Sequence, residues 1–173
     1  MKIILIGFMG AGKSTIGKLL SLELSLPWIE TDTLVFEKTG CKDMLEVFAK
    51  GGESLLREKE LIIAKELSFL ERGVFSTGGG FILHKISMEH LKQKKGVVFF
   101  LQASFEVLEK RIFDKKSRPL FQDRAAAENL YNLRLPLYLS YADYVIHTDK
   151  NSPQEICSSI QNHLISRDHS YVF

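Results

Sequence analysis

A run of glycines, a lysine and two hydroxyl residues near the start of the chain has the composition and spacing of a phosphate site. Residues 7–15 read Gly-Phe-Met-Gly-Ala-Gly-Lys-Ser-Thr and follow an apolar segment, residues 2–6. That segment has the length and β-branched content of a strand buried on both faces, and helical spacing begins at Ser14. Glycines let successive N–H groups converge on an anion at a helix N-terminus. We predict a nucleotide phosphate site in which Lys13 reaches the β- and γ-phosphates and Ser14 ligates Mg²⁺.

Carboxylates and further glycines follow two other short apolar segments. Residues 28–29 lead into Glu30-Thr31-Asp32, and residues 74–77 lead into Gly78-Gly79-Gly80. In open α/β sheets, ligands bind at the carboxyl ends of the strands. Asp32 is therefore placed to orient an acceptor hydroxyl and take its proton, with an N-cap of the next helix as the alternative interpretation. The three glycines form either a flexible turn or a place where backbone N–H groups approach a ligand closely.

Arginines supply the remaining candidate binding groups. Arg57 and Arg134 lie on separate predicted helices, and a guanidinium can bind a planar anion through two parallel hydrogen bonds. Arg57 also has acidic neighbours in the sequence, and surface ion pairs with them would contribute little. Arg118 lies in a polar segment, where it is either solvated or close to phosphates. We interpret Tyr138 as a residue of the core or rim.

The order of apolar segments predicts an α/β fold. Strands are expected at residues 2–6, 28–29, 74–77, 97–101 and 144–147. Helices are expected at residues 14–24, 33–38, 43–48, 53–70, 86–92, 105–115, 124–135 and 154–165, with Pro136 interrupting the seventh before residues 137–142 continue it. Ser104 and Asp43 are candidate N-caps. Five strands that alternate with helices imply a parallel sheet covered on both faces.

Length, composition and charge restrict the class of protein. The 173 residues suffice for one domain with a full core, and a net charge of +2 favours neither a nucleic-acid nor an anionic membrane partner. No stretch approaches the roughly 20 apolar residues of a membrane span, and the first apolar run is too short for a signal peptide. Cys41 and Cys157 lack a paired or metal-binding spacing and are expected to be free thiols. We therefore expect a cytoplasmic protein.

Several motifs together resemble those of the shikimate kinase family. They are Gly-Phe-Met-Gly-Ala-Gly-Lys-Ser-Thr at 7–15, Thr31-Asp32, Gly52-Glu53…Arg57…Glu60, Ser76-Thr77-Gly78-Gly79-Gly80, Arg118-Pro119-Leu120 and Arg134-x-Pro136-Leu137-Tyr138. The resemblance spans nearly the whole chain. It implies a P-loop α/β/α fold of three layers, similar to nucleoside monophosphate kinases, with a five-stranded parallel sheet in the order 2-3-1-4-5. It implies one kinase domain, residues 1–173, with a helical substrate-binding region at about 32–60 and a lid at about 112–124.

The resemblance also implies an activity and a role for individual residues. The γ-phosphate of ATP would pass to the 3-hydroxyl of shikimate in a monomer that uses Mg²⁺, with Lys13, Asp32 and Arg118 catalytic. The implied nucleotide-binding residues are Gly10, Ala11, Gly12, Lys13, Ser14, Thr15, Arg111, Arg118 and Pro153, of which Arg111 and Pro153 flank the adenine. The implied substrate-binding residues are Asp32, Arg57, Glu60, Gly78, Gly79, Gly80 and Arg134, where the two arginines bind the carboxylate.

The sequence departs from the family pattern at a few positions. Glu30 stands where the family usually has aspartate, and we expect it still to support Mg²⁺, its extra methylene changing whether a water intervenes. Phe36 replaces a frequent glutamate and Leu56 a frequent phenylalanine, both in the substrate-binding region. Two other interpretations stay open: a kinase of another small polyol or acid, such as gluconate, and a nucleotide-binding module without catalysis.

Overall fold

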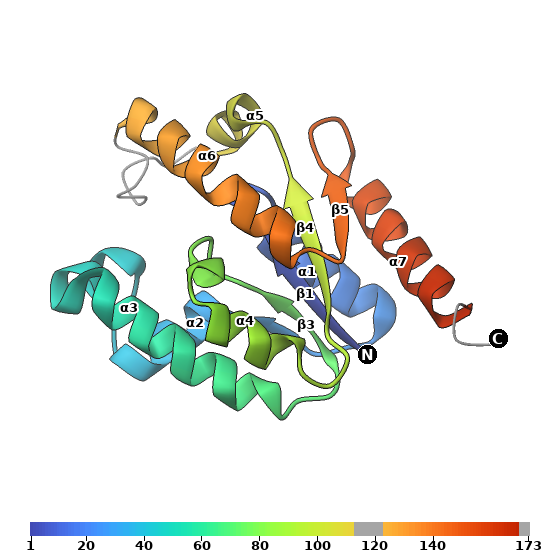
Figure 1. The fold of residues 1–173 in the computed structure, drawn as a ribbon, viewed down its shortest axis with the longest axis horizontal. Helices are drawn as coiled ribbons and strands as arrows, with labels where there is room; N and C mark the ends of the chain where they lie inside the picture. The colour runs from blue at the N-terminus through green and yellow to red at the C-terminus, as the bar shows by residue number, and fades with distance from the viewer. Residues whose placement is uncertain (113–122, 170–173) are drawn as a thin grey trace.

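The computed structural model describes residues 1–112 and 123–169 and contains a parallel sheet of five strands (Figure 1). The strands are β1 (Lys2–Ile6), β2 (Trp28–Glu30), β3 (Gly73–Ser76), β4 (Val97–Gln102) and β5 (Tyr144–His147). Their order across the sheet is β2-β3-β1-β4-β5, and every neighbouring pair is parallel. The predicted strand order is confirmed.

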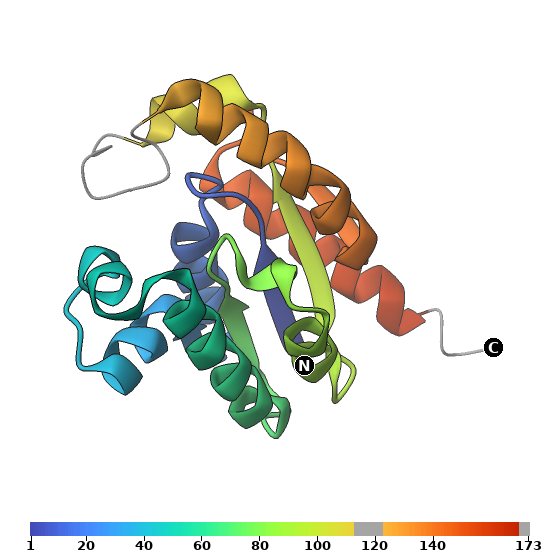
Figure 2. The same ribbon diagram turned by 60° about the vertical axis from the view of Figure 1, so that its left-hand side comes forward.

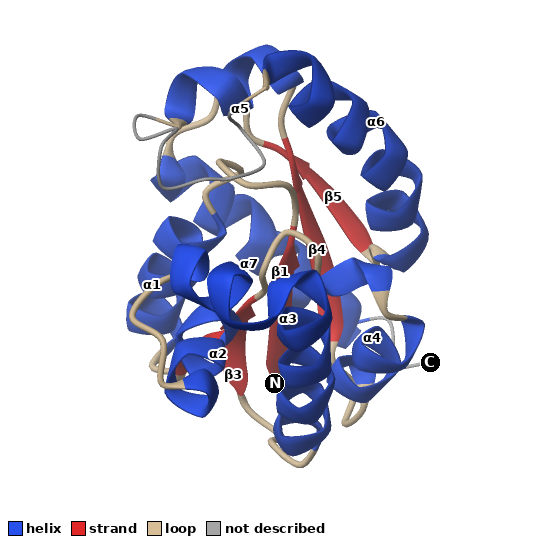
Figure 3. Cartoon of the chain, turned by 90° about the vertical axis from the view of Figure 1, so that its left-hand side faces the viewer, coloured by secondary structure: helices blue, strands red, loops and turns tan. Residues whose placement is uncertain are grey.

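Helices cover both faces of this sheet, as the alternating pattern predicted. They are α1 (Lys13–Leu24), α2 (Thr31–Thr39), α3 (Met44–Ser68), α4 (Lys85–Lys92), α5 (Phe105–Arg111), α6 (Arg124–Tyr141) and α7 (Pro153–His169), with a short 3₁₀ turn η1 (Phe81–Leu83). On one face α1 packs against α7, and on the other lie α3, α4 and α6 (Figures 2 and 3). Helices α2 and α3 pack together beside the sheet (Figure 1). None of the helices in the described ranges combines the length and apolarity that a membrane crossing requires.

The core lies on both sides of the central strands. Residues 3–6 of β1 and 97–101 of β4 are buried on both faces of the sheet. This explains why neither segment contains a polar residue. Helix α1 buries Ile16 and Leu20 against one face, and α3 buries Ile63 and Ala64 on the other. Both cysteines are buried free thiols, as predicted.

Three strands end at the same edge of the sheet and bring the candidate motifs together. Ser76 at the end of β3 is in register with Leu5 of β1 and with Glu30 of β2. Just beyond, the Thr77 N–H donates to the Leu5 carbonyl at 3.2 Å. The phosphate loop, the acidic segment and the triple glycine therefore meet at one edge.

The helix boundaries correct several predictions. Helix α2 begins at Thr31, two residues earlier than expected, because the chain turns into the helix directly from β2. Pro136 does not interrupt α6, which continues to Tyr141: the packing of a buried face outweighs the roughly 3 kcal/mol that an interior proline costs. Helix α5 ends at Arg111 because Ile112 is extended, and the side chain of Ser104 makes no capping hydrogen bond.

The two helices predicted at 43–48 and 53–70 are the arms of one kinked helix, α3. Gly52 has φ 64° and ψ −160°, a conformation that a residue with a side chain rarely adopts and that breaks the helical path. The Asp43 side chain accepts from the Glu46 N–H, so its predicted capping role is confirmed. The kink separates the first arm of α3 from the arm that contains Arg57 and Glu60.

Candidate active site

The phosphate loop has the conformation that its glycines predict. Gly10 and Gly12 have φ of 82° and 93°, in the left-handed region. A Cβ on Gly7 would lie 2.8 Å from the Leu101 carbonyl oxygen, so the loop can pass β4 only without a side chain there. The Lys13 ammonium donates to the carbonyls of Gly7 and Phe8 at 2.8 and 3.0 Å. Lys13 is thus held over the loop, beside the N-terminus of α1, where an anion is stabilised.

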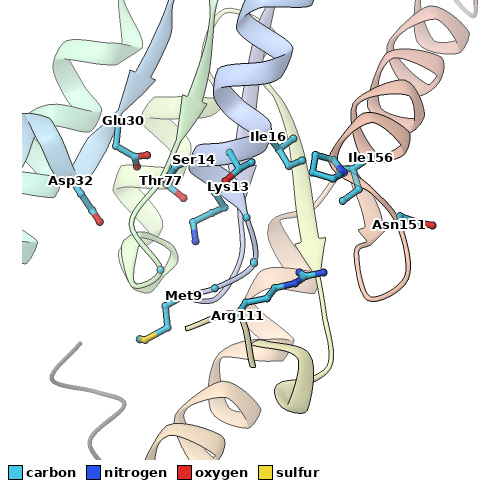
Figure 4. Close-up of a pocket in the computed structure, with 16 residues that line it drawn as sticks. Met9, Lys13, Ser14, Ile16, Glu30, Asp32, Thr77, Arg111, Asn151 and Ile156 are labelled. Carbon is cyan, nitrogen blue, oxygen red and sulfur yellow. The ribbon is translucent and has the colours of Figure 1, made fainter. Parts of the chain in front are cut away.

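A cavity of about 470 Å³ opens over this loop (Figure 4). Its walls are formed by Met9, Gly10, Ala11, Gly12, Lys13, Ser14, Thr15, Ile16, Glu30, Asp32, Thr77, Gly79, Arg111, Asn151, Pro153 and Ile156. Figure 4 shows the carboxylates of Glu30 and Asp32 on one side of Lys13 and Arg111 on the other. The volume is in the range of ordinary small-molecule sites.

Arg111 and Pro153, the pair predicted to flank a base, line the same side of the cavity. The Arg111 guanidinium donates to the side-chain oxygen of Thr148 at 3.0 Å and to its carbonyl at 2.5 Å. These bonds fix the arginine to the segment between β5 and α7. Arg111 is therefore more than an ordinary surface residue, and it forms a wall with Asn151 and Pro153.

Two carboxylates, those of Glu30 and Asp32, line the acidic side of the cavity. Burial raises the pKa of Glu30, a hydrogen bond with Ser14 opposes the rise, and the charge of Asp32 adds to it. Asp32 lies in the first turn of α2, where Glu30 and not Asp32 occupies the N-cap position, so the alternative N-cap interpretation of Asp32 is wrong. A hydroxyl and a carboxylate that contact each other beside a phosphate loop are oxygen donors of the kind Mg²⁺ takes together with phosphates.

The triple glycine packs against charged side chains on both of its flanks. A Cβ on Gly78 would lie 2.6 Å from Oδ1 of Asp32 and 3.1 Å from Oε1 of Glu60, and one on Gly80 would lie 2.2 Å from the Arg57 guanidinium. None of the three glycines has a positive φ. A side chain on Gly78 or Gly80 would therefore displace these neighbours, so these two glycines leave room and do not supply conformational freedom. Gly79, between them, lines the cavity.

Arg57 is fixed by two glutamates of its own helix. It donates to Glu53 Oε1 at 2.7 Å and to Glu60 Oε2 at 2.5 Å, and its side chain is 11% exposed. Burial lowers the pKa of Arg57, but Glu60 and Glu53 outweigh that effect and raise it. Burial, opposed by the charge of Arg57 and assisted by the Asp32 carboxylate, raises the pKa of Glu60 to about 7. Glu60 thus links Arg57 to the Asp32 side of the site.

Arg134 projects from α6 towards Arg57. It is 3% exposed, its guanidinium lies 6.0 Å from the centre of the Phe8 ring, and its Nε has no hydrogen-bond partner among the described residues. Burial lowers the pKa of Arg134, a hydrogen bond with Tyr138 opposes this, and the like charge of Arg57 lowers it further. Arg57 and Arg134 do not line the cavity itself but are connected to it through the triple glycine. A buried cation with an unused donor is suited to an anionic ligand.

The predicted site residues of the described ranges lie in this one region, and the structure adds others. Arg118 and most of the predicted lid lie outside the described residues. Thr31 accepts a hydrogen bond from the Gly78 N–H at 2.9 Å, which fixes α2 to the triple glycine. Tyr138, interpreted from the sequence as core or rim, is buried and donates to the Gly79 carbonyl at 2.5 Å. Its spacing of four residues from Arg134 was the signal for a shared helix face.

Comparison with known proteins gives one consistent result. The family model described as "Shikimate kinase" matches residues 9–165. The shikimate kinase of Thermodesulfovibrio yellowstonii is 38% identical over 161 residues, covering 91% of each chain. The structure of the Acinetobacter baumannii shikimate kinase in complex with shikimate has a TM-score of 0.89 at 32% identity, over 96% of this chain and 93% of that one. The Aquifex aeolicus shikimate kinase has a TM-score of 0.84 at 35% identity, over 97% and 98%.

Proposed function

The chain belongs to the shikimate kinase family, and we propose that the site described above transfers the γ-phosphate of ATP to the 3-hydroxyl of shikimate. The family membership makes it an ATP-dependent phosphotransferase that uses Mg²⁺. The observation that carries the assignment of the acceptor to this site is the buried Arg134, whose Nε finds no acceptor in the part of the chain that the structure describes, beside the anchored Arg57. A small acid with a hydroxyl group satisfies these donors and Asp32 at once.

The nucleotide is proposed to occupy the cavity above the phosphate loop. Amides of residues 10–15 and the Lys13 ammonium surround its phosphates, and Arg111 and Pro153 flank its base. Lys13 must leave the carbonyls of Gly7 and Phe8 to reach the phosphates, which replaces two neutral acceptors with charged ones. Ser14 and Glu30 would hold Mg²⁺, which would supply neutralisation of the charge on the phosphoryl group.

Asp32 is proposed to act on the acceptor. It lines the cavity beside Lys13 and adjoins Gly78, where its carboxylate can orient a hydroxyl and take the proton. Arg57 and Arg134 bind the carboxylate of shikimate, and Glu60 holds Arg57 in place by accepting a hydrogen bond from its guanidinium. Gly78, Gly79 and Gly80 let these side chains approach each other, and Arg118 is proposed to close over the phosphates from a lid at about 112–124.

The surroundings of the enzyme are part of the proposal. We place it in the cytoplasm, as a monomer of one kinase domain whose substrate-binding region spans about 32–60, with no nucleic-acid or membrane partner. Gel filtration combined with light scattering tests the monomer. A mass of twice the 19.7 kDa chain would contradict it.

Release of ADP from ATP tests the proposed function. We expect rapid release with shikimate, little with gluconate and little without acceptor, since exclusion of water prevents wasteful hydrolysis. Preference for gluconate would support the alternative of another small-acid kinase. Nucleotide binding without release under any condition would support the non-catalytic module.

A further inference from the structure

Tyr138 connects two parts of the site that lie far apart in the sequence. From α6 its hydroxyl donates to the Gly79 carbonyl at 2.5 Å, across 59 positions of the chain. The ring is fully buried and stacks on Phe100, with centroids 5.0 Å apart and planes 14° apart. Burial raises the pKa of Tyr138, so the hydroxyl keeps its proton at neutral pH. Tyr138 is therefore a permanent donor in a fixed place.

The same hydroxyl also contacts Arg134. A hydroxyl has one proton to donate and lone pairs that accept. Its proton goes to Gly79, and its neighbour is the guanidinium four residues earlier on α6: burial raises the pKa of Tyr138, and the charge of Arg134 opposes that rise. One oxygen atom thus joins the buried arginine of the acceptor site to the backbone of the triple glycine.

Gly79 in turn lies against the phosphate loop. The position of a Cβ on Gly79 is 3.4 Å from the Met9 nitrogen and 3.7 Å from the Gly7 oxygen, and Gly79 lines the cavity with Lys13 and Asp32. Because the peptide is planar, fixing the Gly79 carbonyl also fixes the direction of the Gly80 N–H on its opposite side. The hydrogen bond from Tyr138 therefore sets the orientation of a peptide between the two substrates.

We propose that Tyr138 is a positioning residue that couples Arg134 to Gly79 and so fixes the acceptor site relative to the phosphate loop. It touches neither reacting group and acts through its two partners. The inference rests on the proposed function and adds a residue to that site.

The variant Tyr138→Phe removes the hydroxyl and keeps the stacked ring. We expect kcat/KM for shikimate to fall about 10-fold, the size of one buried hydrogen bond, while the KM for ATP stays within about twofold of wild type. Tyr131→Phe is the matched control, since Tyr131 is also buried on α6 and donates to a backbone carbonyl, that of Ala103, at 2.9 Å. It should lose similar thermal stability and keep its kinetics.

Two further variants keep the test decisive. In an Arg134→Lys background, Tyr138→Phe should cause less than about a twofold additional loss if Tyr138 acts through Arg134. Incorporation of 4-aminophenylalanine at position 138 restores a donor and should recover most of the activity, even if the phenylalanine variant folds poorly. Wild-type kinetics in Tyr138→Phe, an equal defect in Tyr131→Phe or full additivity with Arg134→Lys would each overturn the inference. A wild-type protein that cannot phosphorylate shikimate would instead refute the proposed function.

Discussion

Replacing Arg134 with methionine should weaken acceptor binding without weakening the fold. Arg134 is 3% exposed, and burial together with the like charge of Arg57 lowers its pKa although Tyr138 opposes this. Burying this charge therefore costs free energy in the empty protein. Methionine has similar length and no charge to desolvate, so we expect the melting temperature of Arg134→Met to equal or exceed that of wild type.

Although its stability should not fall, Arg134→Met should bind shikimate more weakly than wild type does. Two parallel hydrogen bonds from a desolvated guanidinium to a carboxylate contribute about 3 kcal/mol, which corresponds to a rise of roughly 100-fold in the KM for shikimate. Steady-state ADP release gives the KM. Thermal melts with and without shikimate give stability, and the stabilisation by shikimate expected for wild type should vanish in Arg134→Met.

Arg124→Met is the matched control for this variant. Arg124 lies on the same helix but is exposed, and its ion pairs with Glu109 and Glu128 are on the surface. Its removal should leave the KM for shikimate unchanged. A wild-type KM in Arg134→Met, or an equal rise in Arg124→Met, would refute the assignment of Arg134 to the acceptor.

Three further outcomes follow from the carboxylates of the site. Asp32→Asn should lower kcat by about 10²–10⁴-fold because it removes a positioned base, as measured by ADP release. Glu30→Gln should raise the Mg²⁺ concentration needed for half-maximal rate, and an unchanged metal dependence would contradict the proposed role of Glu30 in supporting Mg²⁺. Because the pKa of Glu60 is raised to about 7, protonation below that pH weakens its bond to Arg57, so the KM for shikimate should rise between pH 8 and 6. Glu60→Gln should remove this pH dependence.

The stability of the empty protein should respond to pH in the opposite sense. The pKa of Glu60 in the fold is above its ordinary value of 4.5. The folded state therefore binds the proton more tightly, and stability rises as the pH falls from above 7 towards 4.5. Urea melts of wild type and Glu60→Gln across this range isolate the contribution of the residue. A contribution of opposite sign would mean that Glu60 is ionised throughout.

Local patterns predicted the sheet and the phosphate loop because both depend on short-range rules. An apolar run followed by glycines at fixed spacing determines a buried strand, a loop and a helix start, and the structure has them at residues 2–24. The helix boundaries were less predictable. Pro136 forbids one hydrogen bond locally, but tertiary packing by Tyr131, Arg134 and Tyr138 maintains the helix.

The reason for the triple glycine could not be read from the sequence. Conformational freedom and close approach to a ligand were both open, whereas in the structure a side chain on Gly78 or Gly80 would collide with Asp32 or Arg57. Those neighbours come from α2 and α3, and no local rule predicts which side chains will meet there. The burial of Tyr138 agrees with its interpretation as a core or rim residue, but its hydrogen bond to Gly79, 59 positions away, could not be predicted for the same reason.

An analogue of shikimate in which a primary amide replaces the carboxylate tests the central claim most directly. If Arg57 and Arg134 bind that carboxylate while Asp32 acts on the hydroxyl, kcat/KM for the amide should be about 100-fold lower than for shikimate with wild-type protein. With Arg134→Met the two compounds should differ by far less, because the amide and the substitution remove the same interaction. Equal rates for both compounds with wild type, or an undiminished preference for the acid in Arg134→Met, would contradict the account.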